Sequence, residues 1–238
     1  MSGNFRFFSA GPLPVLAIVL LIALILLLIP LFVLGVIGAA FTRLGLSWIA
    51  ALALVLLMFA GSFVNIPVYR IRRDMIRAVP LDSAGYEMGS PFGVVPVWET
   101  VISINAGGGI IPVCIAAYMV YQAVVITAIP VFGPVILCVA LVTAITYIST
   151  REIPGLGIHV PLFIPALTAL LAGFLLSGNT GLAAAVTALA GGTLGTLAGG
   201  NLAHLFRVRD LEIPEASIGG TGTFGAVFLC CILPALIA

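Results

Sequence analysis

Residues 13–40 read LPVLAIVLLIALILLLIPLFVLGVIGAA and contain no charged side chain. A helix needs about 20 predominantly apolar residues to cross the hydrocarbon core of a bilayer, so this run is long enough to do so. The apolar region of a cleaved signal peptide is only about 7–15 residues long. We therefore expect a retained first membrane span, kinked at Pro30.

The composition of the whole chain agrees with this first run. Of its 238 residues, 62% are hydrophobic and 7% are charged, and the mean hydropathy is +1.32. A soluble domain carries roughly 25% charged residues, so the composition excludes a water-soluble globule. All nine basic residues are arginines and the net charge is +1, which leaves no basic stripe for nucleic acid. We expect a multi-pass protein of the plasma membrane.

Hydropathy divides the chain into seven candidate spans, at residues 13–40, 46–68, 101–123, 126–149, 158–177, 181–205 and 217–238. With the N-terminus inside, the inside segments hold eight arginines and the outside segments hold Arg43 alone, which is the bias of the positive-inside rule. We predict an all-α polytopic helix bundle, a single domain over residues 1–238, with the N-terminus inside and the C-terminus outside. Residues 69–99 are predicted to form a cytoplasmic Arg-rich loop between spans two and three.

The third span begins unlike a helix. Residues 101–105 (VISIN) alternate in polarity, and Gly107, Gly108 and Gly109 follow, although glycine is a poor helix former. One interpretation is a short interfacial strand followed by a helix that starts near Gly109. The other is an unwound segment that contributes backbone groups to a site, as in the discontinuous helices of transporters.

Spans six and seven are rich in small residues. Between residues 181 and 203, 13 of 23 residues are Gly or Ala, and Gly191, Gly195 and Gly199 are four apart. This spacing is typical of a helix face that lets a neighbouring helix approach closely. Residues 218–225 (IGGTGTFG) either pack against span six or expose backbone N–H groups as an anion site. They lack the Gly-Lys end of a phosphate-binding loop.

Polar side chains at membrane depth are costly and are therefore candidate functional groups. Asn201 and His204 are three residues apart, so a helix would place them on one face. They either line a pocket with Asn105 and the glycines of span seven, or Asn201 bonds a neighbouring backbone and His204 lies at the interface near Arg207. Further polar candidates are Asn65, Glu99 and His159. The predicted ligand-binding residues are Asn105, Gly107, Gly108, Asn201, His204, Gly220, Gly222 and Gly225.

Four arginines follow the second span. Arg70, Arg72, Arg73 and Arg77 either contact anionic lipid headgroups, at about 1 kcal/mol per charge, or only fix the topology. Membrane lipids are the expected partners, together with a small polar solute or another membrane protein. The small-residue faces would also allow a homo-oligomer.

No catalytic residue, metal ligand or cofactor is predicted. The chain has two histidines in separate segments, without His-x-x-x-His or His-Glu-x-x-His spacing, and it lacks Gly-x-Ser-x-Gly. Three aspartates fall in polar loops rather than in spans: Asp74, Asp82 and Asp210. The cysteines lie in apolar runs and are interpreted as small apolar residues: Cys114, Cys138, Cys230 and Cys231.

Five motifs in a fixed order carry a family resemblance. They are Asn65-Ile66-Pro67, residues 105–109 (NAGGG) with Pro112, residues 154–158 (PGLGI) with Pro161 and Pro165, residues 192–197 (GTLGTL) and residues 218–224 (IGGTGTF). Together they resemble the archaeal and bacterial membrane family known as domain of unknown function 1614, from about residue 60 to the end. The resemblance implies a polytopic membrane architecture and brings no activity with it.

The resemblance also implies two aspartates in the family pattern, one at the end of span six and one after Gly-Thr-Phe of span seven. These positions are Asn201 and Gly225 here. Two such aspartates would resemble an intramembrane aspartyl protease, which needs a pair of carboxylates that share a proton. We therefore predict a non-enzymatic protein that transports or binds a small solute in a cavity between spans three, six and seven. The alternatives are a protease-like fold without its catalytic aspartates, or an accessory membrane subunit.

Overall fold

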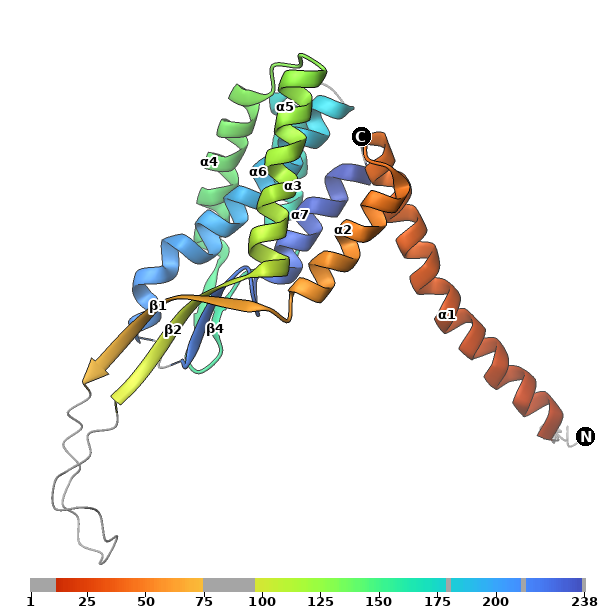
Figure 1. Ribbon diagram of the computed structural model, residues 1–238, viewed down its shortest axis with the longest axis horizontal. Coiled ribbons are helices and arrows are strands. Elements are labelled where there is room, and N and C mark those ends of the chain that lie inside the picture. Colours follow the sequence, from red (N-terminus) through yellow and green to blue (C-terminus); the bar gives the residue numbers. More distant parts are fainter. Residues whose placement is uncertain (1–11, 75–96, 179–180, 211–212, 237–238) are drawn as a thin grey trace, which may run out of the picture.

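The computed structural model describes residues 12–74, 97–178, 181–210 and 213–236. Helices make up most of this part of the chain (Figure 1). The α-helices are α1 (Pro12–Arg43), α2 (Trp48–Gly61), α3 (Ile111–Tyr121), α4 (Phe132–Ser149), α5 (Ile164–Leu176), α6 (Leu182–Thr196) and α7 (Phe224–Leu236).

The helices alternate in direction along the bundle. The connections after α1, α3 and α5 lie at one end, and all strands lie at the other end, which we call the strand end (Figure 1). The strands are β1 (Asn65–Asp74), β2 (Val97–Asn105), β3 (Arg151–Ile153), β4 (Gly157–His159) and β5 (Glu215–Ile218). Every second connection therefore passes through the strand end.

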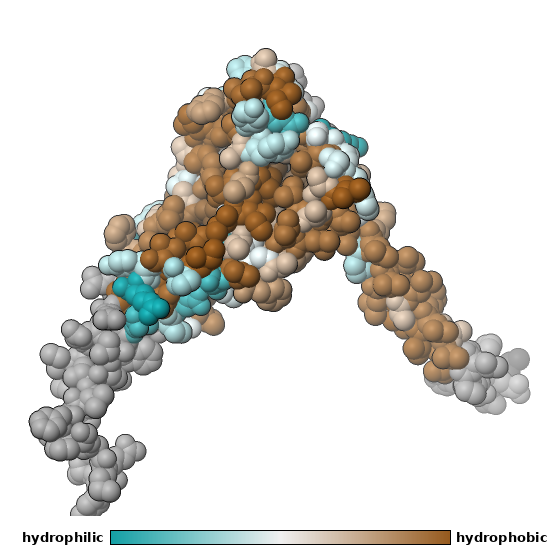
Figure 2. All heavy atoms as spheres, viewed as in Figure 1, coloured by the Kyte–Doolittle hydropathy of each residue, from teal (hydrophilic) through white to brown (hydrophobic). Residues whose placement is uncertain are grey.

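Each of the seven predicted spans contains an apolar helix. Within the described ranges, four helical stretches are long and apolar enough to cross a membrane: Val15–Arg43, Ala106–Ile126, Phe132–Ser149 and Leu182–Val208. Three further apolar helices are shorter, namely α2, α5 and α7. Apolar residues dominate the outer surface of the bundle and of α1, which diverges from the bundle (Figure 2). These features define an integral membrane protein.

The helix α6 lies at the centre of the bundle, where it packs against α3, α4, α5 and α7. Twelve of its fifteen residues are buried. Gly191, Gly195 and Gly199 face α4, and a methyl group on any of them would collide with Cys138, Val142 or Thr143 respectively. The predicted small-residue face is therefore a helix-packing face, in which the absence of side chains lets two backbones approach.

The strands correct the all-α prediction. β1 and β2 pair antiparallel, and β5 joins the other edge of β2 in parallel, while β3 and β4 form a small hairpin. β-Branched and aromatic residues that alternate with polar ones favour strands where the chain leaves the apolar bundle. The ends of the predicted loop at 69–99 thus belong to β1 and β2, and residues 75–96 lie outside the described part of the chain.

The start of the third span is a strand followed directly by a helix. β2 ends at Asn105, a π-helical turn (Ala106–Ile110) follows, and α3 continues from it. A second π-helical turn (Gln122–Ile126) ends this helix. The strand-then-helix interpretation is confirmed, although the helix begins slightly earlier than predicted. The unwound alternative is wrong, because Gly107, Gly108 and Gly109 are buried within the helical turn.

The sixth helix also changes its winding at the strand end. α6 passes into a π-helical turn (Leu197–Asn201) and then into a 3₁₀ segment (Leu202–Asp210). Such π turns are rare and occur frequently at functional sites. Two of the π-helical turns lie at the strand end, and each has one of the predicted asparagines at its boundary. Asn105 precedes the turn Ala106–Ile110, and Asn201 ends the turn Leu197–Asn201.

Candidate functional site

Asn105 ties the end of β2 to the end of α2. Its side chain is 1% exposed. The Nδ2 atom donates hydrogen bonds to the carbonyl oxygen of Ser62 at 2.7 Å and to Oδ1 of Asn65 at 2.9 Å. Its Oδ1 accepts a hydrogen bond from the N–H of Gly108 at 2.8 Å. Asn105 therefore caps the π-helical turn before α3 and satisfies backbone groups that would otherwise be unpaired.

Asn201 has the same role at the end of the sixth helix. It is 2% exposed, and its Nδ2 donates to Oγ1 of Thr223 at 3.1 Å. Its Oδ1 accepts a hydrogen bond from the N–H of Gly219 at 3.3 Å. Asn201 thus fastens the turn between β5 and α7 to the sixth helix. The prediction that Asn201 bonds neighbouring groups is confirmed.

The two asparagines are connected through a contact between glycines. Gly108, which Asn105 caps, packs against Gly219, which Asn201 holds, and a Cβ on either residue would collide with the backbone of the other. Gly219 also has a φ of +75°, which favours glycine. The structure therefore brings the ends of spans three, six and seven together, as the sequence predicts.

A small polar cavity lies beside Asn201 at the strand end. Its volume is about 60 Å³. A water molecule needs roughly 10–15 Å³ on a comparable measure, so the cavity can hold several waters or a solute of a few heavy atoms. Its lining residues are Asn65, Leu156, Gly157, Ile158, Asn201, Leu205, Ile213, Glu215, Ala216, Ser217, Ile218 and Thr221.

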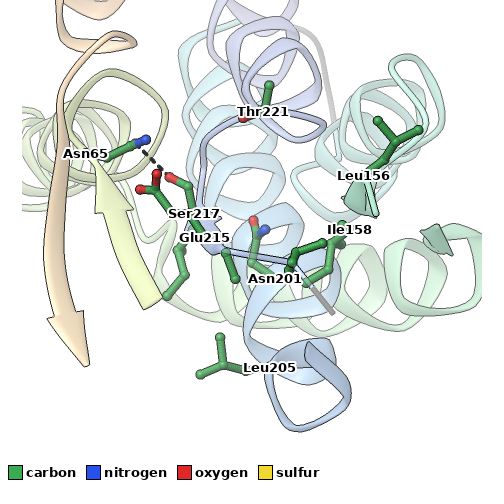
Figure 3. A pocket seen from close by; sticks show the side chains of 12 residues that line it. Asn65, Leu156, Ile158, Asn201, Leu205, Glu215, Ser217 and Thr221 are labelled. Carbon is green, nitrogen blue, oxygen red and sulfur yellow. Dashed lines mark hydrogen bonds between the residues drawn. The ribbon is translucent and has the colours of Figure 1, made fainter. Parts of the chain in front are cut away.

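The polar lining comes from three different elements (Figure 3). Glu215 and Ser217 lie on β5, close to Asn65 of β1, and Ser217 Oγ donates to Oδ1 of Asn65 at 2.8 Å. The carboxylate of Glu215 accepts a hydrogen bond from the hydroxyl of Ser103, which is 1% exposed. Asn201 approaches from the sixth helix. The cavity therefore carries a carboxylate, although none of the predicted ligand-binding residues is acidic.

Apart from His204, the predicted ligand-binding residues separate into two groups. Asn201 lines the cavity, and Asn105 and Gly108 lie behind it, connected through Asn65 and Gly219. The remaining glycines pack against neighbouring atoms: Gly107 against the end of α2, Gly220 against Ser217, Gly222 against Ile158 and Gly225 against Leu162. These glycines act in packing.

Three polar residues of the cavity were neither predicted site residues nor further polar candidates. Glu215 falls in a short polar stretch between the predicted sixth and seventh spans, and Ser217 and Thr221 lie at the start of the predicted seventh span. Asn65 was one of the further polar candidates. The Asn65-Ile66-Pro67 motif was the sequence signal that could have placed Asn65 in the site.

His204 lies in a different place. The ring is 3% exposed, its Nδ1 is 2.9 Å from the carbonyl oxygen of Gly199, and its Nε2 is 3.8 Å from a carboxylate oxygen of Glu152. It lines a groove with Tyr147 and Arg207 that shares no lining residue with the cavity. Asn201 and His204 therefore line two separate sites and not the one pocket of the first interpretation.

The four arginines predicted to bind lipid headgroups are described only in part. Arg70 is exposed on β1, and its guanidinium lies 3.6 Å from the carboxylate of Glu99. Arg72 and Arg73 belong to β1, but their side chains lie outside the described residues, as does the whole of Arg77. Their contact with lipid stays a prediction.

The two positions of the family aspartates face different neighbours. Asn201 bonds Thr223 and Gly219, whereas a Cβ on Gly225 would lie 2.7 Å from Cδ1 of Leu162.

The four cysteines are free thiols, and Cys138, Cys230 and Cys231 are buried within the bundle. Within the described residues, no group of three or more His, Cys, Asp or Glu side chains is arranged to hold a metal ion.

The fold and the site define a polytopic membrane helix bundle whose strand end is closed by small sheets. The family described as Protein of unknown function (DUF1614) matches residues 59–237, and the chain belongs to this family. The family resemblance of the five motifs is thereby confirmed. No curated protein and no solved structure matches the chain.

Proposed function

We propose that this protein crosses the plasma membrane seven times and binds a small polar solute in the cavity at the strand end. The short helices α2, α5 and α7 have 13 or 14 residues, which is roughly 20 Å at 1.5 Å per residue. Each one nevertheless runs between the two ends of the bundle, next to longer helices (Figure 1). Extended residues at their ends supply the remaining length.

Charge supports an orientation with the strand end in the cytoplasm. Arg70, Arg151 and Arg207 are exposed at the strand end, and Arg43 lies at the opposite end of the bundle. Cytoplasmic segments of membrane proteins carry the excess of arginine. This orientation places the N-terminus inside and the C-terminus outside.

Solute binding rests on one observation, the polar cavity beside the π-helical turn at the end of the most buried helix. Buried polar groups and irregular helix segments form the binding sites of many transport proteins. Asn201, Ser217 and Asn65 supply amide and hydroxyl groups there, and Glu215 supplies a negative charge. Because the cavity opens at the strand end, binding from the cytoplasm is the first step, and transport would require a further opening toward the other side.

Native mass spectrometry of the protein in mild detergent tests the proposal. We expect a discrete small molecule on the wild-type protein and on Glu152→Gln, which removes a carboxylate at the strand end outside the cavity. Glu215→Gln and Asn201→Ala should lose the molecule. A bare wild-type protein, or equal retention by Glu215→Gln, would contradict solute binding. A bound membrane protein without a small ligand would instead favour an accessory subunit.

A further inference from the structure

A second polar site lies at the strand end, in the groove beside His204. The groove has a volume of about 620 Å³ and lies between the end of α4 and the 3₁₀ segment after the sixth helix. Its lining residues are Tyr147, Ile148, Thr150, Arg151, Glu152, His204 and Arg207. It is thus larger and more open than the cavity beside Asn201.

Arg207 is held in place over this groove. One guanidinium nitrogen is 3.3 Å from a carboxylate oxygen of Glu152, and the other donates to the hydroxyl of Tyr147 at 3.4 Å. The ring of Tyr147 in turn packs on that of His204, with centroids 4.8 Å apart. A guanidinium has five N–H donors, so Arg207 keeps donors for a ligand after these two contacts.

Arg151 adds a second cation to the groove. Its side chain is exposed, and among the described residues it has no ion-pair partner. The two arginines outweigh the single carboxylate of Glu152, so the groove has a net positive charge. Two guanidinium groups at one groove favour a phosphate, which they can bind through paired hydrogen bonds.

Large apolar side chains flank the charged groups. Ile148, which lines the groove, is 81% exposed, and Phe206, which directly precedes Arg207 in the chain, is 87% exposed. Side chains of this kind at the end of an apolar helix fit the boundary between acyl chains and headgroups. The groove therefore presents cations at headgroup level and apolar surface on the side of the acyl chains.

We propose that this groove binds the phosphate of an anionic phospholipid, with Arg151 and Arg207 as its ligands. The lipid's acyl chains lie along the exposed apolar residues of α4 and of the 3₁₀ segment after the sixth helix. Basic pockets between helices on the cytoplasmic side of membrane proteins bind anionic headgroups in this way. Glu152 lies against Arg207, and its negative charge repels the phosphate, while a glutamine there could still accept the hydrogen bond from Arg207.

The test uses the full chain in mild detergent with defined lipids. Native mass spectrometry counts the bound molecules of phosphatidylglycerol and of phosphatidylcholine. We expect Arg151→Gln and Arg207→Gln each to lower the affinity for phosphatidylglycerol about five-fold, because one arginine near the surface contributes about 1 kcal/mol. Arg43→Gln, which removes the same charge at the other end of the bundle, is the matched control and should retain wild-type affinity.

Glu152→Gln distinguishes lipid binding from a purely structural role of the side-chain cluster that Tyr147, Glu152, His204 and Arg207 form. If Glu152 repels a bound phosphate, this variant binds phosphatidylglycerol more tightly than the wild type. If the cluster only holds the fold together, Glu152→Gln weakens lipid binding and lowers the melting temperature, which would overturn the proposal. Equal affinities of Arg43→Gln and the two groove variants would also overturn it.

Inorganic phosphate provides the second arm of the experiment. A lipid site requires apolar contact, so millimolar phosphate should displace little phosphatidylglycerol. Displacement of all the lipid by phosphate would assign the groove to a soluble phosphate compound and would contradict a lipid site. The groove shares no lining residue with the cavity beside Asn201. The lipid proposal and the solute proposal can therefore be refuted independently.

Discussion

The backbones of Gly108 and Gly219 are in direct contact, which joins the turn before α3 to the turn before α7. Asn105 bonds the first of these glycines and Asn201 bonds the second. The glycine contact and the two asparagines therefore form one unit that closes the bundle at the strand end. The cavity beside Asn201 depends on this unit for its shape.

We expect Gly108→Ala to destabilise the protein by about 1–3 kcal/mol, because its methyl group collides with the carbonyl of Gly219 and neither backbone can move freely. Gly133→Ala in α4 is the matched control, since a Cβ there has open space around it. Thermal unfolding in detergent measures both. Equal melting temperatures for the two variants would show that the turns before α3 and α7 can separate.

Asn105→Ala should also destabilise the protein by about 1–3 kcal/mol. It leaves the N–H of Gly108 and the carbonyl oxygen of Ser62 without their partner in a buried site. Ser47→Ala is a milder comparison, because Ser47 caps α2 with one bond to the N–H of Ala50 at 3.2 Å in an exposed position. A larger loss of stability for Ser47→Ala than for Asn105→Ala in the same assay would contradict the stabilising role of the hydrogen bonds that Asn105 makes.

The glycines of spans six and seven should respond differently to alanine. A methyl group on Gly199 collides with the carbonyl of Thr143, so Gly199→Ala should force α4 and the sixth helix apart and lower stability by about 1–3 kcal/mol. A methyl group on Gly225 meets only the end of the Leu162 side chain, which is 44% exposed and can rotate away. Gly225→Ala should therefore change the melting temperature little, whereas a loss equal to that of Gly199→Ala would contradict this difference.

The helix bundle was predictable because the sequence patterns that produce it each lie within a single segment of the chain. Apolar runs predict the helices, and glycines four residues apart predict a close-packing face on the sixth helix, which the structure places against α4. Asn105 and Asn201 were also predictable as functional or structural groups, since a buried amide needs partners. Each of these features follows from composition and spacing within one segment.

The remainder of the site depends on contacts between distant segments. Glu215 and Ser217 reach the cavity because β5 pairs in parallel with β2, with Ser217 opposite Ser103, and this register has no signal within either strand. Asn201 and His204 do not share one pocket for a different reason. The three-residue spacing rule holds within a regular α-helix, but Asn201 ends a π-helical turn and His204 lies in the 3₁₀ segment after it.

The seven-span topology predicts which residues face the two sides of the membrane. Thr127 lies in the connection between α3 and α4, opposite the strand end, and Leu156 lies in the β3–β4 turn at the strand end. Both side chains are exposed. In a Cys114→Ala background, we expect a membrane-impermeant maleimide to label Thr127→Cys in intact cells and to leave Leu156→Cys unlabelled.

Permeabilised cells supply the control for this experiment. Both variants should then be labelled equally, because each new thiol is exposed, while the buried thiols of Cys138, Cys230 and Cys231 should stay unreactive. A reversed pattern in intact cells would invert the orientation and place the cavity and the lipid groove outside. Labelling of both variants in intact cells would mean that α4 does not cross the membrane, which its length of 18 predominantly apolar residues and its packing along α6 oppose.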